Sequence, residues 1–513
     1  MISKTILAGY LIWGSFIAVV FCLRPGSGLH RITLETADST VRKRLTIAVL
    51  ICVILLCILP MGLSPSYNGE RPDYTDQYER MAESILNGHF YIDYDDIDPR
   101  LLAMDNPYDF EARKAEGVSY HWDHAFYNGH YYMYFGVVPV FLLFLPYRIL
   151  TGTALTTYHA TQVFTVLFIC GIFSAFHSLA RIFFKKMPLA MYLTLSAAFS
   201  VMSVWYSVDA PALYCTAITA ALCMEVWSIF FFIRAVFGSM EEEQSVRYAF
   251  FGSLFGALAF GCRPPVALAN LLVLPMLAEY LRGKRITFRL FRRLLFAASP
   301  YFVIAALLML YNYMRFGSPF EFGQSYQLTI TDQSQYGDLF SQLDFLKLYN
   351  GITAFFVSHT PMGDTFPYVS FNGILLNFPV LCFAVFGIGS EGVRGEIRAD
   401  HMRHSIRCLF CIPVVIALAD VLWAPTVLER YRMDIYWIMG ILCFIVIGYY
   451  HRNLSGRSAR IFSCVISIWA FITICKCFLL YLVPFDYNFT IYFPEKLEKI
   501  RKMIMLGRGV GII

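Results

Sequence analysis

The sequence predicts an all-α membrane protein that crosses the bilayer about twelve times. Of its 513 residues, 58% are hydrophobic and only 15% are charged, and the mean hydropathy is +0.57. Such values are typical of chains that are surrounded mostly by lipid. Apolar runs that suit a hydrocarbon core of about 30 Å lie at 5–23, 45–63, 158–179, 188–206, 209–236, 247–262, 264–281, 294–313, 371–389, 407–425, 433–450 and 461–483.

Basic residues in the short connections indicate the orientation, because cytoplasmic loops retain Lys and Arg. Five clusters are present: Arg24 to Arg44, Arg181 to Lys186, Arg282 to Arg293, Arg394 to Arg407 and Arg452 to Arg460. If all five are cytoplasmic, an even number of spans must separate neighbouring clusters. The runs satisfy this condition provided that the apolar piece 131–150 does not cross.

The piece 131–150 also contains Gly136, Pro139 and Pro146, which weaken a straight helix. We therefore expect it to re-enter the membrane or to lie along the outer interface, where protein covers its backbone. The predicted organisation is a single membrane domain, 1–513, with external loops at 64–157 and 314–370 and a C-terminal tail at 484–513. The tail is either an amphipathic surface helix or a solvated end.

Cysteine placement and charge exclude two classes of protein. All 14 cysteines lie in or beside apolar runs, so no disulfide framework is indicated. The net charge of +5 is spread among short loops and forms no basic patch with interleaved aromatic residues. The sequence therefore gives no support for nucleic-acid binding.

The first external loop carries candidate acids. It opens with RPDYTDQYERMAESILNG, where Tyr78, Ala82 and Ile85 fall at helical spacing. Asp73 and Asp76 therefore lie just before, or in, the first turn of a short helix. Because Asp also commonly starts helices, a structural and a catalytic role are equally supported at this stage.

Arginines are expected on the same, non-cytoplasmic face. Arg263, Arg315 and Arg430 each lie beside an apolar run, and each alone is most simply a residue that snorkels from a helix end. Together with the carboxylates they favour an anionic substrate at the outer leaflet, since Arg binds phosphate through two parallel hydrogen bonds.

Several segments, taken in order, resemble one enzyme family. DQYERMAESILNG, NPYDFEAR, WDHAFYNGHYYMYFGVVP, CRPP, NYMRFGSPFEFGQSY and ERYRMD are similar to bacterial GT-C glycosyltransferases, in the branch that includes protein O-mannosyltransferases and aminoarabinose transferases. The similarity covers most of residues 64–450. It implies a GT-C-like bundle in the cell membrane that transfers a sugar from a polyprenyl-phosphate carrier to a cell-envelope acceptor outside the cytoplasm.

The resemblance also implies a catalytic carboxylate in the first external loop. Asp76 is the first candidate and Asp73 the second, with Asp123 as a supporting acid. A carboxylate near the membrane can act as general base for an acceptor hydroxyl. The departing lipid phosphate needs cationic stabilisation, and a single displacement, again implied by the resemblance, would invert the anomeric centre. The candidates for phosphate binding are Arg263, Arg430 and Arg315.

Aromatic residues complete the expected site, and whether it holds a metal is an open question. Aromatic rings offer flat apolar surfaces with polar groups at the interface. The expected donor-lining residues are Trp122, Tyr127, His130, Tyr131, Tyr132 and Tyr134. His121, Asp123, His124 and His130 are of types that bind Mg²⁺, Mn²⁺ or other divalent ions, but their spacing is not metal-specific, so the cofactor stays an open question.

Three ionisable residues lie within the predicted spans. Asp420 and Lys476 fall at similar depths in spans of the same direction, which predicts a structural ion pair, and Glu225 also lies inside a span.

Alternative functions are a lipid-linked sugar flippase or transporter, and a catalytically inactive GT-C-like assembly protein. A transporter should concentrate polar groups near the midplane and show repeated halves, whereas here polar groups fall mostly in external loops.

Overall fold

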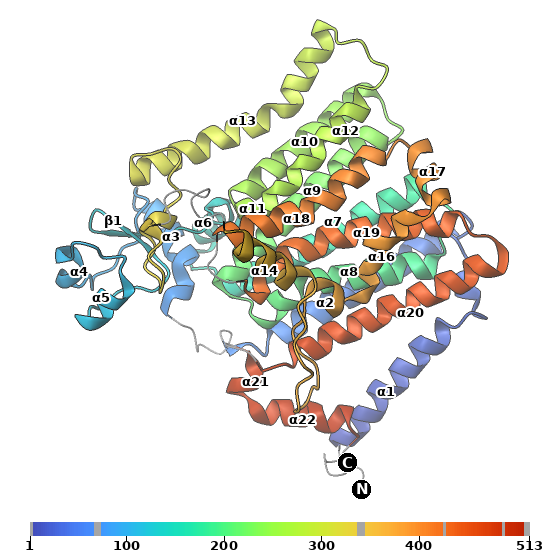
Figure 1. The fold of residues 1–513 in the computed structure, drawn as a ribbon, viewed down its shortest axis with the longest axis horizontal. Helices are drawn as coiled ribbons and strands as arrows, with labels where there is room; N and C mark the ends of the chain where they lie inside the picture. The colour runs from blue at the N-terminus through green and yellow to red at the C-terminus, as the bar shows by residue number, and fades with distance from the viewer. Residues whose placement is uncertain (1–3, 66–72, 336–343, 424–426, 485–487, 507–513) are drawn as a thin grey trace.

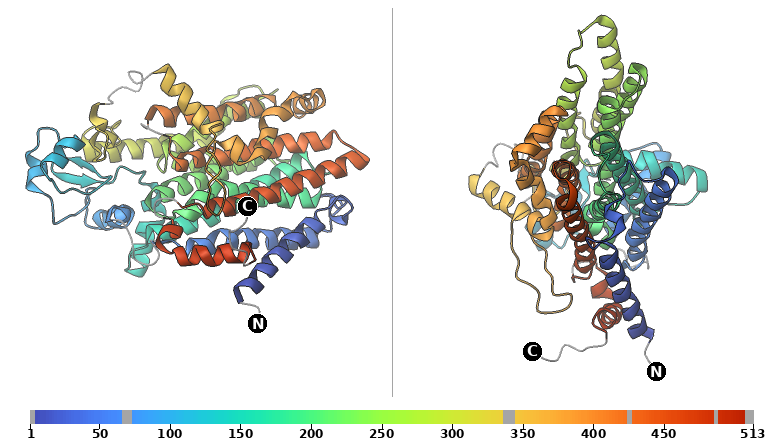
Figure 2. Two further views of the ribbon diagram at one scale, coloured as in Figure 1. Left: turned by 60° about the horizontal axis from the view of Figure 1, so that its bottom comes forward. Right: turned by 90° about the vertical axis from the view of Figure 1, so that its right-hand side faces the viewer.

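The computed structural model describes residues 4–65, 73–335, 344–423, 427–484 and 488–506. Within them, nine helices are long and apolar enough to cross a membrane, and most run side by side (Figures 1 and 2). The predicted all-α, polytopic class is therefore confirmed. The nine are α1 (Lys4–Cys22), α2 (Ser39–Met61), α7 (Thr157–Phe183), α8 (Leu189–Asp209), α9 (Leu213–Phe237), α13 (Phe288–Phe316), α18 (Arg403–Trp423), α19 (Met433–Arg452) and α20 (Gly456–Tyr481).

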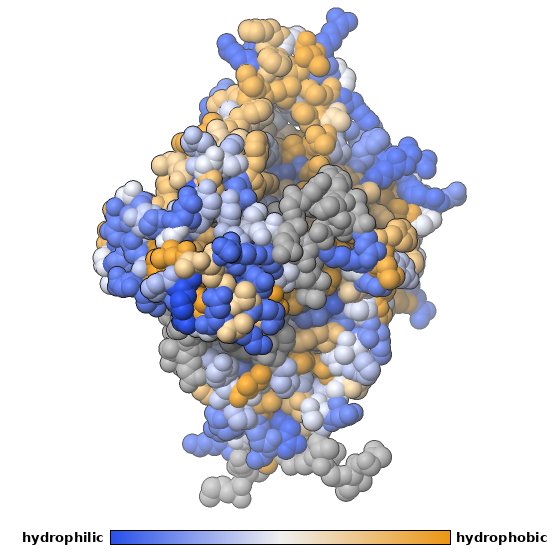
Figure 3. Space-filling model, turned by 60° about the vertical axis from the view of Figure 1, so that its left-hand side comes forward, coloured by the Kyte–Doolittle hydropathy of each residue, from blue (hydrophilic) through white to orange (hydrophobic). Residues whose placement is uncertain are grey.

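The most buried helices are α8 and α19, whose side chains are almost all enclosed. Helix α8 packs against α2, α7, α19 and α20. By contrast, α1 and α13 lie at the periphery and expose apolar side chains such as Leu11, Ile17, Phe302 and Leu307. Figure 3 shows hydrophobic surface over the upper part of the molecule, where α13 lies in Figure 1. Exposed apolar faces of this kind suit contact with lipid.

Three of the twelve predicted runs are not among the nine long apolar helices. The run 247–262 lies in α10 (Glu242–Phe260), which packs between α9 and α13 and begins with acidic residues. The other two runs form the shorter apolar helices Pro264–Tyr280 and Pro379–Gly389, which consist of consecutive short pieces and each begin at a proline, the second after a separate short helix. These pieces are α11 (Pro264–Ala267), η5 (Leu268–Leu272) and α12 (Val273–Tyr280), then α15 (Ile374–Asn377), η8 (Pro379–Leu381), α16 (Cys382–Phe386) and η9 (Gly387–Gly389).

The first external loop forms short elements outside the bundle. They are η3 (Asp73–Asp76), α3 (Gln77–Leu86), α4 (Pro99–Ala103), α5 (Phe110–Ala115), β1 (Ala125–Tyr127) and β2 (His130–Tyr132). β1 and β2 pair antiparallel. Asn128 and Gly129 join them with φ of 50° and 78°, as the tight Asn-Gly hairpin turn requires.

The apolar piece 131–150 forms no long helix. After β2 it continues as a π-helical turn, η4 (Val140–Phe144), and a short helix, α6 (Leu145–Thr151). Its start is held against the turn after α10, because the Val138 amide donates to the Gly261 carbonyl at 3.0 Å. A Cβ at Gly136 would lie 2.3 Å from the carbonyl oxygens of Gly261 and Cys262, so only glycine allows this approach.

The second external loop docks on the first. It contains η6 (Gln324–Tyr326), η7 (Gln333–Gln335) and α14 (Phe345–Phe356). The Asp123 amide donates to the Leu328 carbonyl at 3.0 Å, and the Leu328 amide donates to the His124 carbonyl at 2.8 Å. The two loops therefore form one structure at one end of the bundle, which we call the loop end (Figure 1).

The five basic clusters meet at the opposite end, which we call the basic end. The Glu35 amide donates to the Lys185 carbonyl at 3.0 Å, and Arg452 binds both Asp400, at 2.6 Å, and the Phe183 carbonyl, at 3.4 Å. Arg282 contacts His401, beside α17 (Glu391–Ala399). These contacts connect all five clusters, as the even spacing of spans between them predicts.

The C-terminal segment folds back along the bundle. It contains α21 (Phe489–Tyr492) and α22 (Pro494–Ile504), and α22 packs against α1. The Trp13 indole nitrogen donates to the Ile504 carbonyl at 2.7 Å. The tail is thus a helix docked on the first span (Figure 1).

Candidate functional site

Asp123 is held at the loop end from two directions. It precedes β1 in a left-handed backbone conformation, φ 58°, which is uncommon for residues other than glycine. Its amide binds Leu328 of the second loop, and its carbonyl accepts a 2.9 Å hydrogen bond from Gln77 Nε2 of α3. Strained backbone that several contacts hold in place is frequent at functional sites.

The Asp123 carboxylate is buried, with 6% of the residue exposed. Oδ1 accepts from Gln327 Nε2 at 2.6 Å, and Oδ2 accepts from the Tyr214 hydroxyl at the start of α9. Burial raises the pKa of Asp123 above its usual value, although these hydrogen bonds and nearby Arg430 act in the opposite direction. Both carboxylate oxygens are therefore already engaged within the protein.

Arg430 lies beside this carboxylate in η10 (Glu429–Arg432). Its guanidinium carbon is 4.1 Å from the centre of the Tyr214 ring and 5.4 Å from that of Tyr431. Within the described residues, no carboxylate and no hydrogen-bond partner contacts this guanidinium. A partly buried cation that packs only on aromatic rings keeps its hydrogen-bond donors free for an anion.

Arg263, in contrast, is paired. It lies in the turn before α11, and its Nε and Nη2 are each 2.7 Å from Asp434 Oδ2 of α19. Nη2 also lies 3.8 Å from Asp420 Oδ1 of α18. Its positive charge is thus balanced by two carboxylates from neighbouring helices.

This arrangement contradicts the predicted Asp420–Lys476 ion pair. Asp420 faces Arg263, whereas Lys476 Nζ donates to the Leu376 carbonyl at 3.1 Å. Similar depth in two spans does not mean that the side chains face each other, because the rotation of each helix about its axis is set by packing.

Arg315 holds two elements of the loop end together. It is 5% exposed, and it donates to the Met133 carbonyl at 2.7 Å and to Asn312 Oδ1 at 2.8 Å. Its guanidinium also packs over Tyr311, 4.0 Å from the ring centre. Arg315 thereby ties the chain after β2 to the end of α13.

Asp76 has one oxygen engaged and one free. Oδ2 accepts from Arg80 Nε at 2.6 Å, while Oδ1 is buried and has no hydrogen-bond partner within the described residues. Asp73 begins η3, but its side chain lies outside the described part of the structure. Of the two predicted bases, Asp76 is therefore the one whose carboxylate can be placed.

A polar chain connects Asp76 to the Asp123 region. The Arg80 guanidinium packs 4.7 Å from the centre of the Tyr94 ring, and the Tyr94 hydroxyl donates to His124 Nε2 at 2.9 Å. The His124 Nδ1–H donates to the Trp122 carbonyl at 2.8 Å. Burial lowers the pKa of His124 to about 3, so this imidazole stays neutral and fixed in one tautomer near neutral pH.

The predicted donor-lining aromatic residues separate into two groups. Tyr134 interacts electrostatically with Asp123, Arg430 and Arg263, so it belongs to the site. The other contacts hold the loops together: Tyr127 packs on Tyr326, Tyr131 on Tyr94, Tyr132 on Phe316, His130 on Tyr91, and Trp122 on Tyr120.

A metal set is not assembled by the described residues. No three His, Cys, Asp or Glu side chains among them are placed to hold a metal ion. His121 lies 3.2 Å from Asp96, and His124 binds Tyr94 and the Trp122 carbonyl. The candidate ligands His121, Asp123, His124 and His130 are thus engaged with different neighbours.

Four residues of the site were not expected from the sequence. Gln77 lies in the segment DQYER directly after the candidate Asp76, and Asp434 lies in ERYRMD near the candidate Arg430. Their position beside candidate residues could have pointed to them. Tyr214 and Gln327 had none, because their contacts with Asp123 span 91 and 204 residues of chain. Gln77 is fully buried and its Oε1 has no partner within the described residues.

Comparison with known proteins finds two similar solved structures. Both are of the Archaeoglobus fulgidus oligosaccharyltransferase. The apo form has a TM-score of 0.44 and 12% identity over 86% of this chain and 56% of the archaeal chain. The form tethered to an acceptor peptide containing the NVT sequon has a TM-score of 0.37 and 11% identity over 92% and 57%. This chain therefore spans little more than half the length of that protein. No protein-family model and no curated protein sequence matches the chain.

Proposed function

We propose that the protein is a membrane glycosyltransferase that moves a sugar from a polyprenyl-phosphate carrier to a cell-envelope acceptor outside the cytoplasm. The observation that carries the proposal is the Arg430 guanidinium, which interacts electrostatically with the buried Asp123 carboxylate but forms no ion pair or hydrogen bond among the described residues. A cation held in this way suits a lipid phosphate. The ordered resemblance to GT-C enzymes between residues 64 and 450 supports the same reaction.

Asp76 is the proposed general base. Its buried Oδ1 is free to accept the proton of an acceptor hydroxyl, while Arg80 holds Oδ2 at 2.6 Å. The hydroxyl oxygen then bonds to the anomeric carbon as the bond from that carbon to the phosphate oxygen breaks. The electron pair leaves with the lipid phosphate, and the anomeric centre inverts. Asp73 is the second candidate for the base.

Arg430 is the proposed phosphate ligand, because its donors are available to the departing oxygen. Asp123 supports it by holding the Tyr214 hydroxyl, whose ring lies under the Arg430 guanidinium. Arg263 and Arg315 are proposed to act at longer range, since each already has protein partners. Tyr134 and the free Gln77 Oε1 would face the sugar.

The orientation is also part of the proposal. The five basic clusters meet at the end opposite to the loops, and cytoplasmic surfaces retain such residues. The loop end, with the candidate site, is then extracytoplasmic in a multi-pass cell-membrane protein. In that position it would meet both a lipid-linked donor and an envelope acceptor.

The test uses purified protein in liposomes with a panel of radiolabelled polyprenyl-phosphate sugars and cell-envelope acceptors. We expect transfer by the wild type and a loss of about 100-fold or more for Asp76→Asn. Asp105→Asn is the matched control, because Asp105 is an exposed acid of the same loop. Loss in Asp73→Asn alone would move the base to Asp73. Carrier movement across the bilayer without transfer would favour a flippase, and carrier binding without either would favour an inactive assembly protein.

A further inference from the structure

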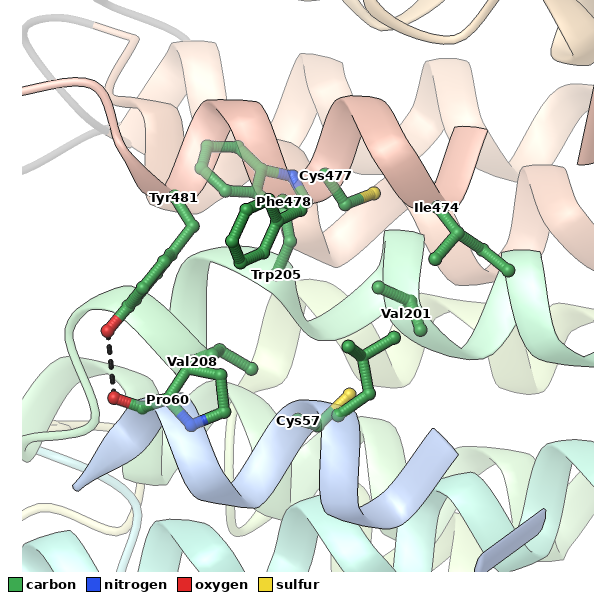
Figure 4. A pocket seen from close by; sticks show the side chains of 10 residues that line it. Cys57, Pro60, Val201, Trp205, Val208, Ile474, Cys477, Phe478 and Tyr481 are labelled. Atoms are coloured by element: carbon green, nitrogen blue, oxygen red, sulfur yellow. Dashed lines mark hydrogen bonds between the residues drawn. The ribbon is translucent and has the colours of Figure 1, made fainter. Parts of the chain in front are cut away.

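A hollow lies between α2, α8 and α20 (Figure 4). Its cavity volume is about 30 Å³, which exceeds the roughly 10–15 Å³ that a water-sized group needs. The residues that define it are Leu56, Cys57 and Pro60 of α2, Trp205 of α8, and Cys477 and Phe478 of α20. Leu56 and Phe478 are each about 40% exposed (41% and 39%), so the hollow opens toward the lipid-facing surface.

Trp205, on the wall of the hollow beside Cys477, carries an unsatisfied donor. Trp205 is 2% exposed, and its indole Nε1–H has no hydrogen-bond partner within the described residues. An indole nitrogen can only donate, and hydrocarbon supplies no acceptor, so leaving it unpaired is unfavourable. The hollow therefore calls for a ligand that is mostly apolar and carries one acceptor oxygen.

The depth of Trp205 indicates which lipid group could supply that oxygen. Trp205 precedes the last residue of α8, Asp209, by four positions, or about 6 Å along the helix. Pro60 and Tyr481 place the ends of α2 and α20 at the same edge of the hollow. Helix ends of this kind lie near the boundary between headgroups and hydrocarbon, where Trp is common. The ester carbonyls of glycerophospholipids lie at that boundary.

We propose that this hollow binds one glycerophospholipid, with an acyl chain between Leu56 and Phe478 and an ester carbonyl that accepts a hydrogen bond from Trp205 Nε1. The proposed sugar carrier is a different ligand, because a polyprenyl phosphate has no carbonyl. Its proposed phosphate ligand, Arg430, packs instead on Tyr214 and Tyr431. The lipid site therefore does not depend on the proposed enzymatic function.

The test compares diester and diether phosphatidylglycerol with equal chains and headgroups, since the diether lacks only the carbonyls. Full-length protein is stripped of lipid in detergent, the two lipids compete for it, and native mass spectrometry measures the bound ratio. We expect the wild type to favour the diester about 2- to 10-fold, the effect of one hydrogen bond. Trp205→Phe, which keeps a ring but removes the N–H, should bind both lipids equally.

Two further variants separate the hydrogen bond from the shape of the hollow. Cys477→Trp should fill the hollow and lower the binding of both lipids, whereas Ile472→Trp is the matched control because Ile472 is a 50% exposed residue of α20 outside the lining. Equal binding of the two lipids by the wild type would overturn the proposal without recourse to any variant. Retained ester preference in Trp205→Phe, or unchanged binding in Cys477→Trp, would overturn it as well.

Discussion

Two arginines, one at each end of the bundle, have different surroundings. At the basic end, Arg452 is 37% exposed and forms ion pairs with Glu396 at 2.7 Å and Asp400 at 2.6 Å. At the loop end, Arg430 packs on two tyrosine rings and has no carboxylate partner within the described residues. Exposed ion pairs contribute little to stability, whereas a partly buried charge without a carboxylate partner is costly unless it has a role, and the proposed role of Arg430 is to bind the donor phosphate.

The strongest test of this comparison is to neutralise one arginine from each end. We expect Arg430→Gln to lower sugar transfer by about 100-fold or more, because the departing phosphate loses its cation. Arg452→Gln is the control and should leave transfer nearly unchanged, since exposed ion pairs contribute little. Initial rates in liposomes measure both. Equal losses in the two variants would mean that the ends do not differ in function.

The buried Arg263–Asp434 ion pair should matter for stability. Asp434→Asn removes the main partner of Arg263 and leaves a charge with only the longer 3.8 Å contact to Asp420. We expect a cost of about 3–5 kcal/mol in unfolding free energy, typical of a broken buried pair. Lys476→Gln, at a residue that contacts a carbonyl only, should cost far less. Denaturation in detergent measures both, and the reverse order would restore Lys476 as an ion-pair partner.

A substitution at Gly136, where two backbone segments touch, should have an intermediate effect on stability. A Cβ there would overlap the Gly261 and Cys262 carbonyls at 2.3 Å, so Gly136→Ala must push the segment after β2 away from the Arg263 turn. The expected cost is about 1–3 kcal/mol, seen as a lower thermal midpoint. Gly14→Ala has nothing within 4 Å of the new atom and should be neutral or stabilising. A neutral Gly136→Ala would show that the two segments need not touch.

The smallest effect, over the first pH unit below 6.5, is a pH dependence of stability from His124. Because burial lowers its pKa to about 3, the unfolded chain binds one more proton than the folded chain between about pH 6.5 and pH 3. The unfolding free energy is therefore unaffected by His124 above pH 6.5. It falls as the pH is lowered through that window, by up to about 1.4 kcal/mol per pH unit. His124→Gln should reduce the slope, whereas His130→Gln, at an exposed ring, should retain it. An unchanged slope in His124→Gln would contradict the assignment.

Much of the fold could be predicted because membrane helices have a local signature. Nine of the twelve runs became single long apolar helices, since their length and composition alone suit the bilayer. The runs around Pro264, Pro265 and Pro379 form shorter helices that begin at Pro264 and Pro379, and these prolines were already visible in the sequence. The failure of 131–150 to form a long helix followed from Gly136, Pro139 and Pro146 in the same way.

The site was only partly predictable. Charged residues beside apolar runs pointed to Asp76, Asp123, Arg263 and Arg430, but not to which of them have partners. Asp434 neutralises Arg263 from 171 residues away, and Gln327 reaches Asp123 across 204 residues. Contacts between residues so far apart in the chain leave no repeating pattern in the sequence from which they could be predicted.

The sequence by itself thus determined that this protein is mostly apolar and helical, where its nine long apolar helices lie in the chain, and which loops hold most of the polar groups. Hydropathy, prolines and basic clusters act locally, and each can be recognised within a few turns of chain. Only the tertiary structure decided that Arg263 is paired while Arg430 has no carboxylate partner in the described part of the chain, and that Asp420 turns toward Arg263 and away from Lys476. Those outcomes depend on how each helix is rotated about its axis, which is set by packing against neighbours that lie far away in the chain.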